Sequence, residues 1–114
     1  MPDSFSKPKD LIIRHVVCFK FKQRAKKNDI ERVEMEFSAL KDKITGISSM
    51  EWGVNNSPEN LNKNFTHCFI VSFEDEQARK NYLPHPEHKA FVSTLKPFLE
   101  DVFVIDFNPQ SSFP

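Results

Sequence analysis

The chain has few of the residues that mark specialised architectures. Its 114 residues include two glycines and two cysteines, and 16 basic side chains are balanced by 16 acidic ones. Two isolated glycines exclude a glycine-rich phosphate-binding loop, and the balanced charge leaves no basic surface, so we expect no nucleic-acid partner. Cys18 and Cys68 form neither a CxxC pair nor a disulfide framework. This predicts buried reduced thiols in a cytoplasmic protein, although neighbouring strands could bring the two together.

Long apolar runs are also missing. No segment approaches the length of a membrane span, so we expect no membrane partner. Residues 1–10 are polar, contain two prolines and lack the apolar stretch of a secretory signal. We interpret residues 1–10 as a flexible N-terminal arm, residues 11–107 as one domain and residues 108–114 as a C-terminal tail.

Phenylalanine is abundant: it accounts for 12 residues in a chain that is 39% hydrophobic. This apolar content is sufficient for the core of one domain. Residues 11–21 and 65–73 are rich in β-branched and aromatic side chains on both faces, which predicts two buried strands. Residues 47–54 alternate apolar and polar side chains like a half-exposed strand, and residues 102–107 form the last predicted strand.

Helices are predicted between these strands. From residue 28 to residue 46 apolar side chains recur at spacings of three and four, with Asn28 as the N-cap and Gly46 at the end. Residues 75–83 predict a short helix that Pro84 breaks, and Pro86 suits the first turn of a further helix reaching Phe98. The order β-α-β-β-α-β predicts an α+β, ferredoxin-like subunit, in which helices cover one face of a four-stranded antiparallel sheet.

The other face of this sheet would be left uncovered. It carries Val16, Cys18, Cys68 and Ile70, an apolar patch that is unusual for a monomer. Two sheets packed face to face across a two-fold axis would remove it, so we expect a homodimer, a dimeric α/β barrel. The alternative is a monomer whose tails fold over the sheet, although polar tails cover an apolar surface poorly.

The four histidines and the single tyrosine are the candidate functional residues. His15 and His67 lie in strands, on the side predicted to face the helices. Tyr82, His85 and His88 lie in NYLPHPEH, where the short helix gives way to the next. Unpaired N–H groups in a first helical turn disfavour positive charge, so His88 would be neutral and able to act as a general base. The Tyr82 hydroxyl could donate to a developing oxyanion.

Two other interpretations of these residues remain open. In one, His85 only satisfies backbone groups at a helix start, His15 and His67 are hydrogen-bonded core residues, and Tyr82 packs with its hydroxyl at the surface. In the other, three or four of the histidines bind zinc. HPEH is one residue short of a helical i, i+4 ligand pair, so we expect no metal. We also expect no cofactor. No elbow motif supports a Ser/His/Asp triad.

Several segments together resemble the stress-responsive A/B-barrel domain (Dabb) family. They are RHVVCFKFK at the first strand, then WG, FTH, YLPHPEH and the final VIDF, and the resemblance extends over about residues 11–107. It implies a ferredoxin-like subunit, a homodimer and a small-molecule pocket between sheet and helices. In a cofactor-independent polyketide cyclase of this family, a Tyr and a His that match Tyr82 and His88 carry the acid–base chemistry. Its other pocket histidines match His15 and His67.

The sequence therefore supports two hypotheses. The first is a homodimer that binds a small apolar or phenolic ligand, with an activity that the sequence does not name. The second is a cofactor-independent cyclase-like or isomerase-like enzyme in which Tyr82 and His88 are catalytic. Glu34 occupies the stretch that lines the alkyl-binding pocket of the cyclase, which predicts a different ligand here. The predicted pocket residues are His15, Val17, Phe19, Val33, Phe37, His67, Phe69, His85 and Phe91.

Overall fold

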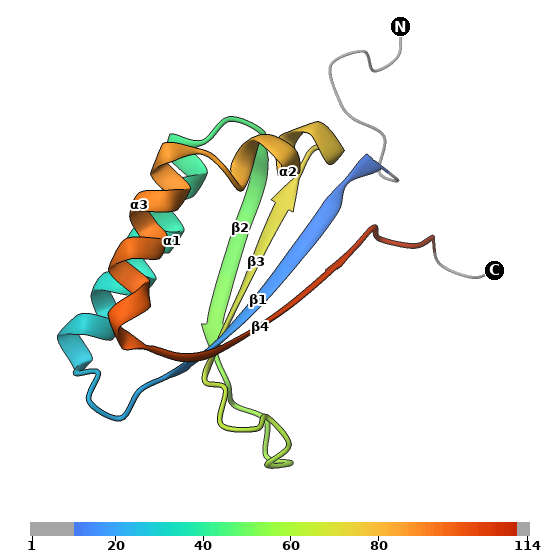
Figure 1. Cartoon of the computed structure of the whole chain (residues 1–114). Helices are drawn as coiled ribbons and strands as arrows, with labels where there is room; N and C mark the ends of the chain where they lie inside the picture. The colour runs from blue at the N-terminus through green and yellow to red at the C-terminus, as the bar shows by residue number, and fades with distance from the viewer. Residues whose placement is uncertain (1–10, 112–114) are drawn as a thin grey trace, which may run out of the picture.

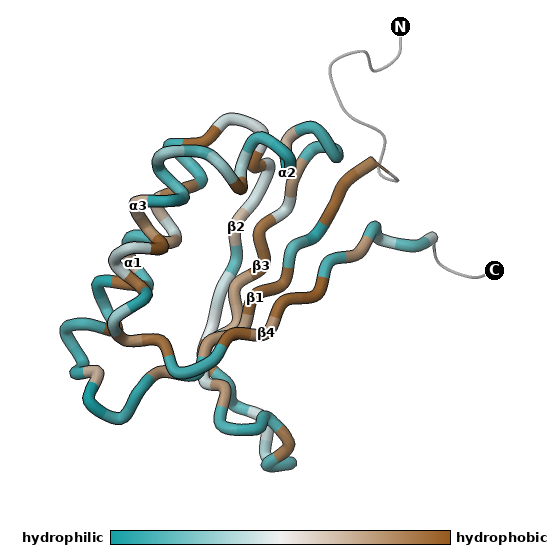
Figure 2. Tube along the Cα trace, in the orientation of Figure 1, coloured by the Kyte–Doolittle hydropathy of each residue, from teal (hydrophilic) through white to brown (hydrophobic). Residues whose placement is uncertain are grey.

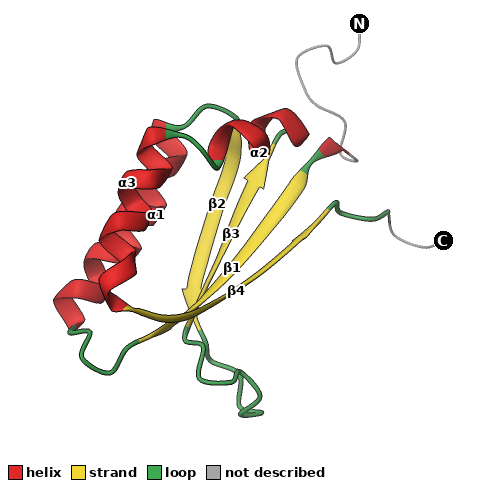
Figure 3. Ribbon diagram, viewed as in Figure 1, coloured by secondary structure: helices red, strands yellow, loops and turns green. Residues whose placement is uncertain are grey.

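A computed structural model describes residues 11–111 as one sheet with helices on one face (Figure 1). Along the chain the elements are β1 (Ile13–Phe21), α1 (Lys27–Lys43), β2 (Ile47–Val54), β3 (His67–Phe73), α2 (Glu76–Tyr82), α3 (Pro86–Leu95), the short 3-10 helix η2 (Lys96–Phe98) and β4 (Leu99–Phe107). The four antiparallel strands lie in the order β2-β3-β1-β4 (Figure 3). The α+β, ferredoxin-like prediction is confirmed. The predicted arm, residues 1–10, and residues 112–114 of the predicted tail lie outside the described residues.

Helix α1 begins earlier than the sequence indicated. The prediction of Asn28 as its N-cap is wrong, because the N-cap is Lys26. The Asp29 carboxylate accepts a hydrogen bond from the backbone N–H of Lys26 at 3.0 Å and so stabilises this earlier helix start. After the helix the chain turns at Gly46, where φ is +100°. A β-carbon at Gly46 would lie 2.7 Å from Cβ of Ala78 in α2, so glycine permits both the turn and the close approach of α2.

The junction between α2 and α3 follows the expected helix signals. The Asp75 side chain caps α2 by accepting a backbone hydrogen bond. His85 caps α3, since its Nδ1 accepts a hydrogen bond from the N–H of Glu87 at 3.0 Å, and Pro86 occupies the first helical position. The first turn of α3 therefore contains His88, as predicted.

The core lies between the helices and the face of the sheet that they cover. Phe37 of α1 stacks on Phe69 of β3 and on Phe91 of α3, with ring centroids 4.4 and 4.5 Å apart. Burying a side chain of this kind stabilises the fold by about 1.5–3 kcal/mol. Hydrophobic segments run along β1, β3 and β4 (Figure 2). Within residues 11–111, no helix has the length and apolar character needed to cross a membrane.

Within residues 11–111, no helix covers the opposite face of the sheet (Figure 3). Cys18 lies directly opposite Cys68 in the β1–β3 register, and both thiols are free. Burial, together with the neighbouring Cys68, raises the pKa of Cys18 to about 11, so that thiol stays protonated at neutral pH. Side chains on β4 extend the apolar surface and are about half exposed: Phe103 (52%), Ile105 (51%) and Phe107 (46%).

Candidate functional site

A cavity of about 610 Å³ lies between the sheet and the helices. It opens along β4. Val102 and Val104 of β4 pair with β1 residues that face the helices, yet Val102 is 43% exposed and Val104 is 48% exposed. Of the residues predicted from sequence, the cavity is lined by His15, Val17, Phe19, Phe37, Tyr82, His88 and Phe91. The structure adds Leu83, Val92, Leu95, Leu99, Val102, Val104 and Asp106.

His88 presents one nitrogen to this cavity in a defined state. Its Nδ1 lies 3.0 Å from the carbonyl oxygen of Leu83 and donates a hydrogen bond to it. A neutral imidazole with Nδ1 protonated has a free lone pair on Nε2. Desolvation by burial lowers the pKa of His88 below 6.5. The nearby imidazoles of His15 and His85 act in the same direction, and the hydrogen bond to Leu83 opposes them. At neutral pH, therefore, Nε2 of His88 is a proton acceptor.

Tyr82 supplies a hydroxyl at the same place. Its side chain is 1% exposed, and its ring lies 4.3 Å from that of His88 and 6.0 Å from that of His15 between centroids. Among the described residues, Tyr82 Oη is the one buried side-chain polar atom without a hydrogen-bond partner. Burial raises the pKa of Tyr82, so the phenol keeps its proton and can donate it in a hydrogen bond to a bound molecule.

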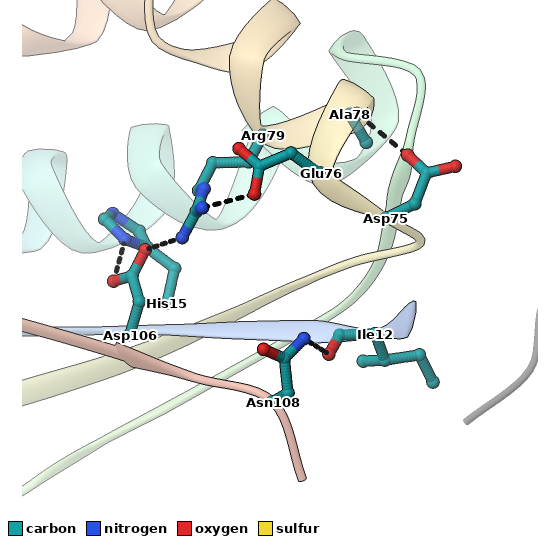
Figure 4. A network of polar contacts seen from close by, with 8 residues as sticks. All are labelled: Ile12, His15, Asp75, Glu76, Ala78, Arg79, Asp106 and Asn108. Atoms are coloured by element: carbon teal, nitrogen blue, oxygen red, sulfur yellow. Dashed lines mark hydrogen bonds and ion pairs between the residues drawn. The ribbon is translucent and has the colours of Figure 1, made fainter. Parts of the chain in front are cut away.

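A polar network supports His15 on the sheet side of the cavity (Figure 4). Its Nδ1 lies 2.7 Å from Oδ1 of Asp106, and Oδ2 of Asp106 lies 3.0 Å from a guanidinium nitrogen of Arg79. Arg79 also donates to Glu76 on its own helix. Sequence reasoning missed Asp106 and Arg79. The available signal was an acidic residue within the otherwise apolar last strand.

Four predicted pocket residues do not line the cavity. His67 is buried outside it, with Nε2 2.7 Å from Oε2 of Glu34 and Nδ1 2.8 Å from the hydroxyl of Thr66. Both its ring nitrogens are thus engaged by the protein, which matches the alternative in which this histidine is structural. Val33 and Phe69 are fully buried, and His85 serves as the N-cap of α3.

Two further features of the described residues bear on ligands. Within residues 11–111 no three His, Cys, Asp or Glu side chains are grouped so as to hold a metal ion. A second cavity of about 430 Å³ lies where the uncovered face of the sheet meets the loop between β2 and β3. Its walls include Cys18, Cys68, Phe103 and the predicted pocket residue His67, but among the described residues no tyrosine lines it with that histidine. The cavity under the helices is the better candidate for chemistry.

Known proteins resemble this chain over nearly its whole length. A family model described as the stress responsive A/B barrel domain matches residues 13–109. The stress-response A/B barrel domain-containing protein HS1 of Arabidopsis thaliana is 32% identical over 99 residues, which are 87% of this chain and 91% of that protein. Olivetolic acid cyclase of Cannabis sativa is 24% identical over 100 residues, 88% of this chain and 99% of that protein.

Solved structures extend the likeness to three dimensions. The crystal structure of At3g17210 from Arabidopsis thaliana has a TM-score of 0.84 and 31% identity, covering 90% of this chain and 99% of that chain. A dimeric protein of unknown function with a ferredoxin-like fold, from Bacteroides fragilis, has a TM-score of 0.68 and 26% identity, covering 85% and 95%. The sheet, the helices above it and their order are therefore common to these proteins.

Proposed function

The chain belongs to the stress-responsive A/B barrel domain family, and on that premise we propose that it is a homodimer that binds a small neutral ligand in the cavity beneath its helices. The observation that supports this most is the composition of the cavity. Its walls are aliphatic and aromatic, and its polar groups gather at one end, where His15, Tyr82 and His88 meet. Such cavities orient an apolar molecule through a few polar contacts.

The charge of the cavity favours a neutral ligand. None of its lining residues in the described chain is Lys or Arg, so no fixed cation is available for a carboxylate or a phosphate. The one acidic lining residue, Asp106, is already engaged by Arg79 and His15. A phenol or an enolisable ketone, with a hydroxyl or carbonyl at the polar end, suits these walls.

A binding assay tests this directly. 2-Naphthol offers an apolar body with one hydroxyl, 2-methoxynaphthalene lacks the hydroxyl hydrogen, and 2-naphthoate carries a charge. We expect 2-naphthol to raise the melting temperature and to bind most tightly, because a ligand that binds only the folded state stabilises it. His88→Ala should reduce this shift, whereas Thr94→Ala on the same helix, outside the cavity lining, should not. Preference for 2-naphthoate, or equal shifts with His88→Ala, would contradict the proposed site.

The homodimer follows from the uncovered face of the sheet. Its half-buried and exposed apolar side chains form a surface that a second copy would cover, and the related Bacteroides fragilis protein is described as dimeric. Ile105→Lys should shift the sedimentation of the protein toward that of a monomer. Met35→Lys, an equivalent change at an exposed position of α1, should leave it unchanged. The free thiols on this face also suit a reducing compartment such as the cytoplasm.

A second candidate function is cofactor-independent proton transfer on the bound ligand. It is favoured by the closeness of a neutral His88 to the Tyr82 hydroxyl, which has no hydrogen-bond partner between residues 11 and 111, and by the likeness to a protein named as a cyclase. In this mechanism Nε2 of His88 removes a proton from carbon, and the Tyr82 hydroxyl stabilises the enolate oxygen that forms. Deuterium exchange at C2 of benzoylacetone measures the step. An exchange rate that is the same in wild type, His88→Gln and Tyr82→Phe would rule the mechanism out.

A further inference from the structure

We propose that Asp106 is a positioning residue that determines the tautomer of His15 and, through it, which ligands the cavity accepts. This inference rests on the proposed binding function of the same cavity and names the chemistry that the cavity selects. His15 and Asp106 lie directly opposite each other on β1 and β4, so the register of the sheet brings them together. The two residues are therefore neighbours only because β1 and β4 pair in this register.

The Asp106 carboxylate specifies the state of the nearer imidazole nitrogen. An ionised carboxylate can only accept hydrogen bonds, so Nδ1 of His15, 2.7 Å from Oδ1, must carry the proton. In the neutral ring Nε2 is then an acceptor. No residue between positions 11 and 111 forms a hydrogen bond with Nε2 of His15, and the ring lines the cavity. The free acceptor is therefore available to a ligand.

Arg79 keeps the carboxylate in this position. It donates to the other oxygen, Oδ2, at 3.0 Å, and its guanidinium also contacts Glu76. A guanidinium has only donors, so the group that faces Arg79 must be an acceptor. A donor group at this position would break the contact with Arg79. The side chain of Asp106 is thus held between one donor on α2 and one on β1 (Figure 4).

The polar end of the cavity consequently offers a specific hydrogen-bonding pattern. The rings of His15 and His88 both contact that of Tyr82, and each of the two imidazoles has Nδ1 occupied as a donor to the protein. Two acceptor nitrogens and one hydroxyl donor remain. This pattern selects a ligand that donates hydrogen bonds from hydroxyl groups over an isosteric ether.

Asp106→Asn gives a sharp test, because it should reverse the tautomer. Arg79 would take the carboxamide oxygen and turn the NH₂ group toward His15, so that Nδ1 becomes the acceptor and Nε2 the donor. Long-range ¹H–¹⁵N NMR spectra of the full chain report the protonated nitrogen of each histidine, with His15→Gln used for assignment. We expect Nδ1–H in wild type, Nε2–H in Asp106→Asn, and no change in Asp101→Asn, an exposed position on the same strand.

Ligand affinity provides a second, independent measurement. Asp106→Asn should weaken 2-naphthol about tenfold, as expected for one hydrogen bond made to a mismatched partner, and 2-methoxynaphthalene by less than twofold. An Nε2–H signal in wild type, or an unchanged tautomer in Asp106→Asn, overturns the inference, as does equal 2-naphthol affinity in the two proteins. The wild-type spectrum needs no ligand, and it needs His15→Gln only for assignment. A failure of 2-naphthol to bind wild type would count against the proposed function, while the spectrum would still decide the role of Asp106.

Discussion

Replacing Tyr82 by Phe should make the ligand-free protein more stable. The substitution removes only the hydroxyl, and the ring keeps its contacts with Phe73, at 4.9 Å between centroids, and with His88, at 4.3 Å. In most proteins the loss of a buried hydroxyl destabilises the fold, because its hydrogen-bond partner is left unpaired. Tyr82 Oη has no such partner among the described residues, so the opposite sign is expected.

The magnitude follows from the cost of burying an unpaired polar group. That cost is about 1–3 kcal/mol, and the small void left by the missing oxygen offsets part of the gain. A net increase of about 1 kcal/mol in the free energy of unfolding is expected. For a domain of this size it corresponds to a rise of roughly 3–6 °C in melting temperature. The same substitution should weaken binding of 2-naphthol, since the hydroxyl is the donor at the polar end of the cavity.

Urea denaturation at one fixed protein concentration measures the change, because a dimer's stability depends on concentration. Ser72→Ala is the matched control. Ser72 is 2% exposed, and its hydroxyl accepts a hydrogen bond from Arg14 at 2.7 Å, so its removal should lower the free energy of unfolding by about 1–3 kcal/mol. If Tyr82→Phe is as destabilising as Ser72→Ala, the hydroxyl has a structural partner and the reasoning fails.

Three further predictions test the fold and the site. Gly46→Ala should destabilise the protein by more than about 1 kcal/mol, because φ is positive and the new methyl would lie 2.7 Å from Cβ of Ala78. Gly53→Ala is the control: a Cβ there would have no atom within 4 Å, so urea titrations should show nearly unchanged stability. Phe37→Ala should cost about 3–5 kcal/mol through loss of two stacked contacts; a cost below about 1 kcal/mol would contradict the packing. Because the pKa of His88 is lowered from 6.5, its ring is neutral at pH 7 and becomes protonated only below pH 6.5. Protonation removes the acceptor on Nε2, so affinity for 2-naphthol should fall as the pH decreases below 6.5. The fall should be absent in His88→Gln; an identical acid limb in that variant would assign it to another group.

The α2–α3 junction shows what could be predicted locally. Pro84, Pro86 and the position of His88 in a first helical turn follow from backbone rules that act over a few residues. The closeness of Tyr82 to His88 follows from the same short segment. The Asn28 cap failed for a local reason too, since the competing side chain, Asp29, was the next residue.

Assigning the strand histidines required more than their place in the alternation. His15 and His67 were both expected to face the helices, and His15 lines the cavity while His67 is bonded to Glu34. Which helix lies above a strand residue depends on how α1 and α3 pack across the sheet. Periodicity along one strand contains no information about that packing.

The sequence by itself determined the elements, their order, the buried face of each and the placement of Tyr82 and His88 at the α2–α3 junction. These depend on side-chain periodicity and on turn residues that interact with near neighbours along the chain. Only the tertiary structure decided that Asp106 and Arg79 support His15, that Glu34 engages His67, and that the Tyr82 hydroxyl has no partner among the residues the structure describes. Each of these depends on the register between strands or on the packing of a helix over the sheet. Such contacts join residues distant in the chain, and many distant pairings are compatible with one local pattern.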